Sequence, residues 1–452
     1  MKIVIAVHHF PPTFKGGAEW RAHRTASWLK KQGHTVKVVC VDSINDAQTA
    51  DLRWIDDEFD AIPVRRLFLN LAKSPDRMRW EYDNFWIKAH LNQYLAEEKP
   101  DIFHLISGYL MTAAAIKAAK QQRLPLVMTL TDFWFLCRRH TLYRTSEQVC
   151  FQNTALDCVR CTMEEKRRFK LPAQKMPALT GFLWQAAQPL PPVAKQLTLV
   201  NDRLATLRAA LAEVDVAICP SQFLKQTYLD KGFSAKRMQF LRQGLVHIPS
   251  HPSQKSPSDR LRIGYIGQVA PHKGVHVLID AFLKLRQDAR QAELKLYGDT
   301  SQFPKFYQDM QQKISEAPQL REQVKFLGAF DNQQISQIYQ EIDVLVVPSV
   351  WFENSPNVIL EAFAHRTPVI ASNLGGMAEL VADQKTGLLF NPNDAANLAQ
   401  KLQLILDAPS LLDRLQQNIL PPTALDAEMA ELVQIYQAVL SQPIIEKAPY
   451  ST

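Results

Sequence analysis

Short runs of apolar residues alternate with longer amphipathic stretches along most of this chain. In the first half, runs rich in Val, Ile and Leu cover residues 2–7, 35–40, 101–106, 125–130 and 215–219. Each run has the length and composition of a buried strand, and helical patterns such as residues 18–31 lie between them. Alternating strands and helices predict a parallel sheet that is covered on both faces.

The alternation stops near residue 245 and then begins again. Residues 247–258 are polar, rich in proline and serine, and lack an apolar period, which is typical of an interdomain linker. Beyond them, strand patterns cover residues 261–266, 293–297, 323–327, 343–347, 367–371 and 387–390.

These patterns predict an α/β fold with two Rossmann-like, doubly wound parallel-sheet domains. The N-terminal domain is expected at 1–245 and the linker at 246–260. The second domain is expected at 261–422, and a C-terminal helix at 423–452 is expected to pack back on the first domain. Two such domains face each other across a cleft, and clefts at domain interfaces are where ligands bind.

Charge and hydropathy narrow the classes of partner. The formal net charge, 52 − 45 = +7, suits a phosphate-bearing substrate or an anionic membrane surface, and a basic surface without a special partner is the alternative. No stretch approaches the roughly 20 apolar residues of a membrane span. The apolar residues 1–7 are typical of a first strand and not of a signal peptide. We therefore expect a cytoplasmic protein with no nucleic-acid partner.

A candidate binding element lies at residues 350–364. Ser355 followed by Pro356 predicts a helix start, with the helix running to about His365. Glu353 precedes this helix, and Glu361 lies within it on the face of its first free N–H groups, which are those of Asn357 and Val358. Two carboxylates near a helix N-terminus can accept hydrogen bonds from sugar hydroxyls. The alternative is one surface glutamate and one capping glutamate.

Two glycine-containing turns add to this element. Lys273 ends a turn that follows the strand pattern at 261–266. There its positive charge could bind a diphosphate. The alternative is an ordinary solvent-exposed lysine. Gly375 and Gly376 follow the strand pattern at 367–371. Paired glycines permit close approach of the backbone to a ligand, or merely form a tight turn.

Together these residues resemble the GT-B-fold retaining glycosyltransferases of family 4, and the resemblance covers nearly the whole chain. It rests on the E-x7-E motif of Glu353 and Glu361, on Lys273 with the glycine that follows it, and on the strand pattern that ends before residues 348–349. Gly16 and Gly17 resemble part of that family's glycine-rich first loop.

The resemblance implies a role for each matching residue. Glu361 would bind the ribose, and Glu353 with the backbone of residues 354–357 would hold the donor sugar. Lys273 would neutralise the diphosphate, which Gly16 and Gly17 would approach from the N-terminal domain. The residues expected at the donor are completed by Gln268, Asn354, Ser355, Asn357, Val358, Gly375 and Gly376.

Two departures from the family pattern concern the reacting centre. Gln268 occupies a position that usually carries an arginine, so one cation on the diphosphate is missing. Thr131 occupies a position where the family often has a histidine. His104 is the nearby alternative, and Asp132 is expected to orient the acceptor, so Thr131, Asp132 and His104 form the predicted acceptor side.

The resemblance also implies a mechanism. The sugar would be transferred from a nucleoside-diphosphate sugar with retention, and the leaving phosphate would accept the proton. Lys273, Glu353 and Asp132 would serve the reaction, and no metal would be required for catalysis. The alternatives are a sugar-nucleotide epimerase or hydrolase and a catalytically weak nucleotide-sugar-binding module. A dinucleotide oxidoreductase is disfavoured because residues 11–17 lack G-x-G-x-x-G.

An irregular insertion is expected at about 132–200, where no clean strand pattern is found. It contains four cysteines spaced C-x12-C-x7-C-x2-C, namely Cys137, Cys150, Cys158 and Cys161. Such a set suits a structural zinc, with an iron–sulfur cluster or unligated thiols as alternatives.

The same insertion carries a basic stretch at 164–170 and an aromatic, proline-containing stretch at 177–192. Together these stretches predict peripheral contact with the inner face of an anionic membrane, which suits a lipid-linked or glycan acceptor in the synthesis of cell-surface polysaccharide or glycolipid. The alternative is a solvated charge run beside a packed loop.

Overall fold

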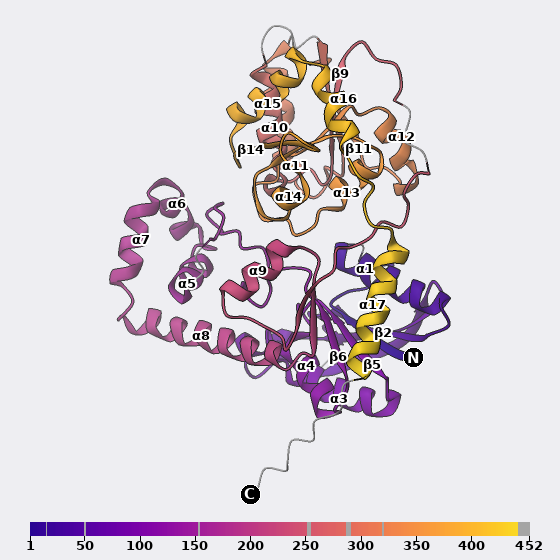
Figure 1. The fold of residues 1–452 in the computed structure, drawn as a ribbon. Coiled ribbons are helices and arrows are strands. Elements are labelled where there is room, and N and C mark those ends of the chain that lie inside the picture. The colour runs from indigo at the N-terminus through magenta and orange to yellow at the C-terminus, as the bar shows by residue number, and fades with distance from the viewer. Residues whose placement is uncertain are drawn as a thin grey trace, which may run out of the picture. The chain divides into compact units, whose positions relative to one another are not determined.

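The computed structural model describes residues 1–14, 16–48, 51–151, 154–250, 255–285, 291–318 and 321–441. They form two compact units (Figure 1). Unit 1 contains residues 1–220, 224–241 and those from 426 onward, and unit 2 contains residues 221–223 and 242–425. The cleft expected between the two domains stays a prediction.

Unit 1 is built on a mixed sheet in the order β3-β4-β2-β1-β5-β6-β7-β8. Only the edge strand β3 is antiparallel to its neighbour, and the other pairs are parallel. The strands are β1 (Lys2–Val7), β2 (Thr35–Ser43), β3 (Leu52–Phe59), β4 (Ile62–Leu69), β5 (Ile102–Ile106), β6 (Leu126–Thr129), β7 (Val216–Cys219) and β8 (Met238–Phe240). The central strands are buried at every position except Lys2 of β1, as their apolar composition predicts.

Helices cover this sheet and form the insertion. They are α1 (Gly17–Lys31), α2 (Arg77–Trp80), α3 (Phe85–Glu98), α4 (Thr112–Gln121), α5 (Ala155–Met163), α6 (Arg167–Lys175), α7 (Pro177–Ala186), α8 (Pro191–Ala212), α9 (Gln222–Asp230) and α17 (Leu425–Leu440). The expectation of an irregular segment at 132–200 is wrong beyond residue 154, because α5 to α8 occupy most of it. In Figure 1, α6 and α7 stand away from the sheet at the far end of α8.

The C-terminal helix α17 packs within unit 1. Its Glu428 accepts a hydrogen bond from Arg21 of α1 at 2.5 Å, and both side chains are buried. Tyr436 of the same helix bonds to His104 of β5 at 2.6 Å. This helix therefore carries polar side chains into the core, where each finds a partner.

Unit 2 is built on a parallel sheet in the order β11-β10-β9-β12-β13-β14. Its strands are β9 (Leu261–Ile266), β10 (Ala292–Tyr297), β11 (Val324–Gly328), β12 (Val344–Val347), β13 (Val369–Ser372) and β14 (Gly387–Phe390). Its helices are α10 (Val275–Leu283), α11 (Pro304–Ser315), α12 (Ile335–Gln340), α13 (Asn357–Ala364), α14 (Gly375–Leu380), α15 (Ala395–Asp407) and α16 (Ser410–Gln417).

The strand order places a ligand-binding position in each unit. In unit 2 the chain winds outward from β9 in one direction and from β12 in the other, so the switch point lies between these two strands. In unit 1 the corresponding point lies between β1 and β5. Ligands of open α/β sheets bind beyond the carboxyl ends of the strands at such points. A ligand-binding site is therefore expected at the loops that follow β9, β12, β1 and β5.

Part of the predicted linker is anchored on unit 2. The ammonium of Lys255 donates hydrogen bonds to the carbonyls of Tyr339 and Ile342 and to the hydroxyl of Thr367, at 2.8, 2.5 and 2.7 Å. Burial lowers the pKa of Lys255 to about 8. The linker therefore contacts unit 2 at Lys255, the linker assignment itself stays a prediction, and residues 251–254 lie outside the described residues.

Candidate functional site

Two loops of unit 2 bring Lys273 and Glu353 together at the switch point. Lys273 ends the turn after β9, and Glu353 lies in the loop after β12. The ammonium of Lys273 donates to Oε1 of Glu353 at 2.6 Å. The same oxygen accepts hydrogen bonds from two residues of its own loop, the indole of Trp351 at 2.8 Å and the hydroxyl of Ser349 at 3.1 Å. The structure thus joins two residues that lie 80 positions apart in the chain.

The two charges of this pair differ in their access to solvent. The Glu353 side chain is 15% exposed and that of Lys273 is 27% exposed. Burial alone would raise the pKa of Glu353, but the charge and hydrogen bond of Lys273, together with Trp351 and Ser349, hold that pKa below its ordinary value. An ammonium has three N–H donors, so Lys273 can bind Glu353 and an outside anion at the same time.

Glycines allow the loops of this site to touch through their backbones. Gly274 follows Lys273 with φ of 73°, and a β-carbon there would lie 1.9 Å from the carbonyl oxygen of Pro348. Gly376 donates its N–H to the carbonyl of Glu353 at 2.7 Å, and a β-carbon there would lie 1.8 Å from the carbonyl oxygen of Asn354. The close approach expected of Gly375 and Gly376 is therefore made to the Glu353 loop itself.

Helix α13 begins one residue later than the sequence predicts. Its N-cap is Pro356 without a side-chain cap, so the expected capping role of Ser355 is wrong. The hydroxyl of Ser355 is buried and has no hydrogen-bond partner among the described residues, while its carbonyl accepts from Gln243 at 2.8 Å. Gln243 also donates to the side chain of Asn357.

Glu361 lies in the second turn of α13 and is partly exposed, as a ligand-binding carboxylate requires. In the first turn, the carbonyl of Val358 accepts a hydrogen bond from the hydroxyl of the buried Tyr339 at 2.9 Å, which fixes the helix to the core. The ribose-binding role of Glu361 stays a prediction.

Gln268 does not place a charge at the switch point. Its side-chain amide donates to Gln302 at 2.5 Å, and its carbonyl accepts from the hydroxyl of Tyr265 at 2.7 Å. His272, beside Lys273, adds no charge at neutral pH, because burial and the neighbouring ammonium lower its pKa to about 4. Lys273 is therefore the cation that the turn after β9 presents at neutral pH.

In unit 1, Asp132 is held by three donors of its own surroundings. Its carboxylate accepts from the hydroxyls of Ser107 and Thr131 at 3.0 and 3.2 Å and from the N–H of Trp134 at 2.8 Å. These bonds tie together the loops that follow β5 and β6. Asp132 therefore has a positioning role in the structure, and its expected contact with an acceptor stays a prediction.

His104 is a core residue, and its assignment to the acceptor side is wrong. It lies inside β5 with 1% exposure, and its ring nitrogens bond to Tyr436 at 2.6 Å and Thr129 at 2.8 Å. Burial lowers its pKa to about 3, so the ring is neutral at physiological pH. Both ring nitrogens have protein partners, which leaves none for a substrate.

Other polar residues, which were not predicted from the sequence, gather at the switch point of unit 1. His8, which follows β1, lies 3.3 Å from Glu19 of α1, and its ring packs edge-on against Tyr109 with centroids 5.5 Å apart. Tyr109 in turn contacts the ring of His140, at 4.4 Å between centroids. The position of His8 directly after the first strand was the available signal.

Gly16 and Gly17 begin α1 in unit 1. Gly16 is the N-cap, and a β-carbon there would lie 2.5 Å from Oε2 of Glu19. Gly17 has no atom near such a position. The diphosphate is expected on unit 2, so the approach of these glycines to it stays a prediction.

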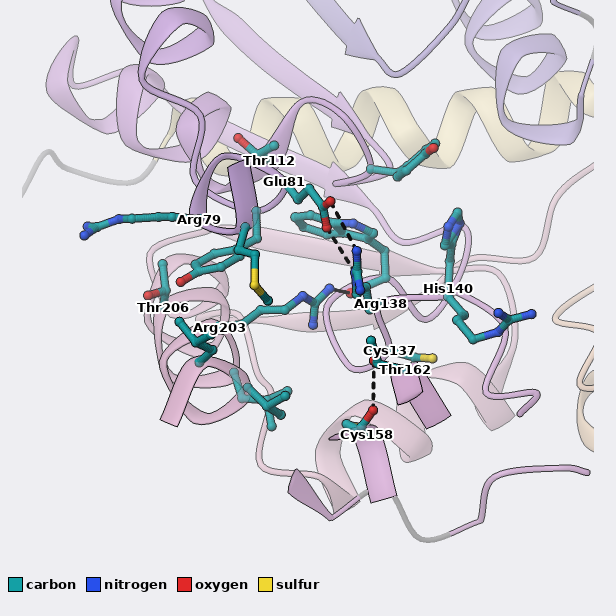
Figure 2. Close-up of a pocket in the computed structure, with 18 of the residues that line it drawn as sticks. Arg79, Glu81, Thr112, Cys137, Arg138, His140, Cys158, Thr162, Arg203 and Thr206 are labelled. Atoms are coloured by element: carbon teal, nitrogen blue, oxygen red, sulfur yellow. Dashed lines mark hydrogen bonds and ion pairs between the residues drawn. The ribbon is translucent and has the colours of Figure 1, made fainter. Parts of the chain in front are cut away.

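A pocket of about 570 Å³ opens in unit 1, and Tyr109 and His140 are among the residues that line it (Figure 2). Its walls come from the loops after β4, β5 and β6 and from α5 and α8. All four cysteines of the insertion line it, and burial raises the pKa of Cys158 to about 12. However, no three His, Cys, Asp or Glu side chains in the described ranges are placed to hold a metal ion. The structure therefore gathers the thiols without showing the predicted zinc site.

The far end of the insertion exposes apolar side chains beside basic ones. Phe182, Leu183 and Leu179 of α7 are 67%, 55% and 50% exposed. The preceding helix α6 carries Arg167, Arg168, Lys170 and Lys175. No helix in the described part of the chain is long and apolar enough to cross a membrane.

Comparisons with known proteins agree with this architecture. A family profile described as glycosyl transferases group 1 matches residues 248–420, and a profile described as glycosyl transferase 4-like domain matches residues 16–244. The chain is similar to the alpha-D-kanosaminyltransferase of Streptomyces kanamyceticus, at 29% identity over 185 residues, or 40% of this chain and 46% of the relative. It is also similar to the glycogen synthase of Mycobacterium tuberculosis H37Rv, at 27% identity over 222 residues, or 49% and 50%. The chain thus spans about half the length of these curated relatives.

Solved structures resemble the whole chain. A structure of Anabaena HepE in complex with UDP has a TM-score of 0.67 at 17% identity and covers 97% of this chain and 100% of its own. A structure of the same protein in complex with UDP-glucose has a TM-score of 0.63 at 19% identity, with the same coverage. Likeness at these identities shows the fold, which is the GT-B architecture that the sequence predicts.

Proposed function

Because this chain belongs to the family of group 1, family 4-like glycosyl transferases, we propose that it moves a sugar from a nucleoside-diphosphate sugar to a hydroxyl acceptor with retention of anomeric configuration. The observation that carries the proposal is the Lys273–Glu353 pair at the switch point of unit 2. It places a partly exposed cation beside a less exposed carboxylate, where a diphosphate and its sugar would lie side by side.

Each part of this site has a distinct task in the proposal. Lys273 neutralises the diphosphate, which HepE's complexes with UDP and UDP-glucose favour as the donor group. Glu353 and the N–H groups at the start of α13, near Asn357, hold the donor sugar. Glu361, which is partly exposed, accepts hydrogen bonds from the ribose hydroxyls.

The proposed reaction needs no strong protein base. The bond between the anomeric carbon and the diphosphate oxygen breaks while a bond from that carbon to the acceptor oxygen forms on the same face. The acceptor proton passes to an oxygen of the leaving diphosphate, whose growing charge Lys273 stabilises. Asp132 keeps the loops after β5 and β6 in place beside the acceptor. A glycan or lipid-linked acceptor at an anionic membrane would suit the net charge of +7 and the exposed face of α6 and α7.

The test is release of nucleoside diphosphate from UDP-, GDP- and ADP-sugars with and without a panel of oligosaccharide and lipid-linked acceptors. The proposal predicts that one donor releases nucleotide only when an acceptor is present, and that NMR finds the product in the donor's anomeric configuration. Release at the same rate without an acceptor would indicate a hydrolase. Binding of a donor without release of nucleotide would indicate a binding module, an alternative that the uncharged Gln268 suggests.

A further inference from the structure

Arg203, which lines the unit 1 pocket, has no carboxylate partner among the residues that the structure describes. Arg203 of α8 reaches into the pocket, where it donates to the carbonyls of Trp134 at 2.5 Å and Phe135 at 3.4 Å. Its guanidinium carbon lies 5.4 Å from the centre of the Trp134 ring. Within the described ranges, no carboxylate forms an ion pair with it. Both of its hydrogen-bond partners are neutral, so its charge is only partly compensated.

Two other arginines of the same pocket, Arg138 and Arg144, are neutralised by carboxylates of the protein. Arg138 pairs with Glu81 through two hydrogen bonds of 3.0 and 3.2 Å, and Arg144 pairs with Asp157 at 2.6 Å. Figure 2 shows Arg203 extending toward Arg138, which forms an ion pair with Glu81. The repulsion from Arg138 and the lack of a carboxylate make the space beside Arg203 favourable for an anion.

Arg203 remains a cation at physiological pH although it lies deep in the wall. Burial lowers its pKa to about 10, which is still well above neutrality. Removing an unpaired cation from water is costly, and a ligand oxyanion bound through two N–H groups would offset that cost. The planar guanidinium suits a carboxylate or a phosphate in this geometry.

The rest of the pocket wall suits a sugar. Trp80, Tyr82, Tyr109 and Trp134 supply aromatic faces, and the volume of about 570 Å³ lies in the range of small-molecule sites. The segment from the end of β5 to the first residue of α4, which forms part of the wall, contains three non-glycine residues with positive φ. These are Ser107 at 64°, Leu110 at 57° and Thr112 at 60°. Such backbone conformations concentrate at ligand-binding loops, and they are especially rare for a β-branched threonine.

We propose that this pocket binds the acceptor and selects one that carries an oxyanion, either a carboxylate or a phosphate, which Arg203 receives. The inference rests on the proposed function only in calling the bound sugar an acceptor. It adds to the proposed function that the acceptor is negatively charged. The aromatic wall would hold the sugar ring, and Arg138 and Arg144, already paired, would shape the pocket without binding the anion.

The experiment compares glucuronic acid, glucose 6-phosphate and neutral methyl glucoside by calorimetric titration. The full chain carries Lys273→Ala to weaken the proposed donor site, so that phosphate bound in unit 2 does not mask the pocket. On this background the variants are Arg203→Gln, Arg203→Lys and Arg208→Gln. Arg208 lies on the same helix, is exposed and does not line the pocket, so it is the matched control.

We expect at least one of the two anionic sugars to bind at least tenfold tighter than methyl glucoside, and Arg203→Gln to abolish that preference. Arg208→Gln should keep it, and Arg203→Lys should keep part of it. Preference for glucuronic acid would identify a carboxylate, and preference for glucose 6-phosphate a phosphate. Equal binding of anionic and neutral sugars, or a preference that survives Arg203→Gln, would overturn the proposal.

A second measurement covers the case in which Arg203→Gln does not fold. In hydrogen exchange of the unmutated chain, the preferred anionic sugar should protect the segments 134–140 and 196–206, and methyl glucoside should not. Protection confined to unit 2 would overturn the pocket assignment. If the donor site fails its own test while these segments are protected, the pocket stands and the proposed reaction falls.

Discussion

The pair of Lys273 and Glu353 predicts an asymmetric response to mutation. Lys273→Met leaves a buried carboxylate without its cation, whereas Glu353→Gln leaves a lysine that can turn to solvent. The glutamine oxygen can still accept from Trp351 and Ser349. The lysine variant should therefore be the less stable of the two, although both remove the same ion pair.

The expected size follows from burial. Breaking a buried ion pair by removing one partner costs about 3–5 kcal/mol, and a hydrogen bond to a charged group contributes about 1.5–3 kcal/mol. Because Lys273 is 27% exposed, solvent screens the pair, and we expect about 2 kcal/mol for Lys273→Met. For a unit of this length that corresponds to a fall in Tm of about 4–8 °C. Glu353→Gln should lower Tm by about half as much.

The assay is thermal unfolding of the ligand-free chain, with Lys305→Met as the control because Lys305 is exposed on α11. The folded-state pKa of Glu353 lies below its ordinary value of 4.5, so its stabilising effect is complete above that pH. The effect disappears as pH falls through the lower folded-state pKa, and the difference between wild type and Lys273→Met should shrink with it. A Lys273→Met chain as stable as Lys305→Met, or less affected than Glu353→Gln, would refute the reasoning.

Three further predictions concern unit 1. His104→Ala should destabilise the chain by about 2–3 kcal/mol in urea unfolding, because it leaves Tyr436 and Thr129 without a partner, while donor binding stays unchanged. Phe182→Ser with Leu183→Ser should reduce sedimentation with anionic vesicles, whereas Leu404→Ser, on an exposed apolar residue of unit 2, should not; equal losses would count against a docking face on α7. If the four thiols that line the pocket bind zinc, protein purified without chelator should contain close to one zinc per chain. A clearly substoichiometric zinc content would show that the thiols are unligated.

Most strands of the two sheets were predictable because they are buried and consist of continuous apolar runs. The hairpin of β3 and β4 was missed because β3 lies at an edge and exposes most of its side chains, among them Asp56, Asp57 and Glu58. The helices of the insertion were missed because prolines interrupt their pattern. Pro172 lies inside α6, and α7 and α8 begin with prolines.

The candidate site was predictable where strand order alone determines proximity. Lys273 and Glu353 each follow a strand at the switch point, so their meeting follows from the parallel sheet. The role of His104 was not predictable, because its partner Tyr436 lies 332 residues away on the C-terminal helix. The unpaired charge of Arg203 was equally hidden, since it depends on which carboxylates the fold assigns to Arg138 and Arg144.

The most direct test of the account is calorimetric titration of UDP-, GDP- and ADP-sugars into wild type, Glu361→Ala and Glu322→Ala. Glu322 is an exposed glutamate of unit 2 before β11 and serves as the control. We expect one donor to bind wild type and Glu322→Ala alike. We expect Glu361→Ala to lose about 1.5–3 kcal/mol, or about 10- to 150-fold in affinity, because a carboxylate that accepts from the ribose is removed. No binding of any donor to wild type, or equal affinity in Glu361→Ala, would contradict a nucleotide-sugar site on unit 2.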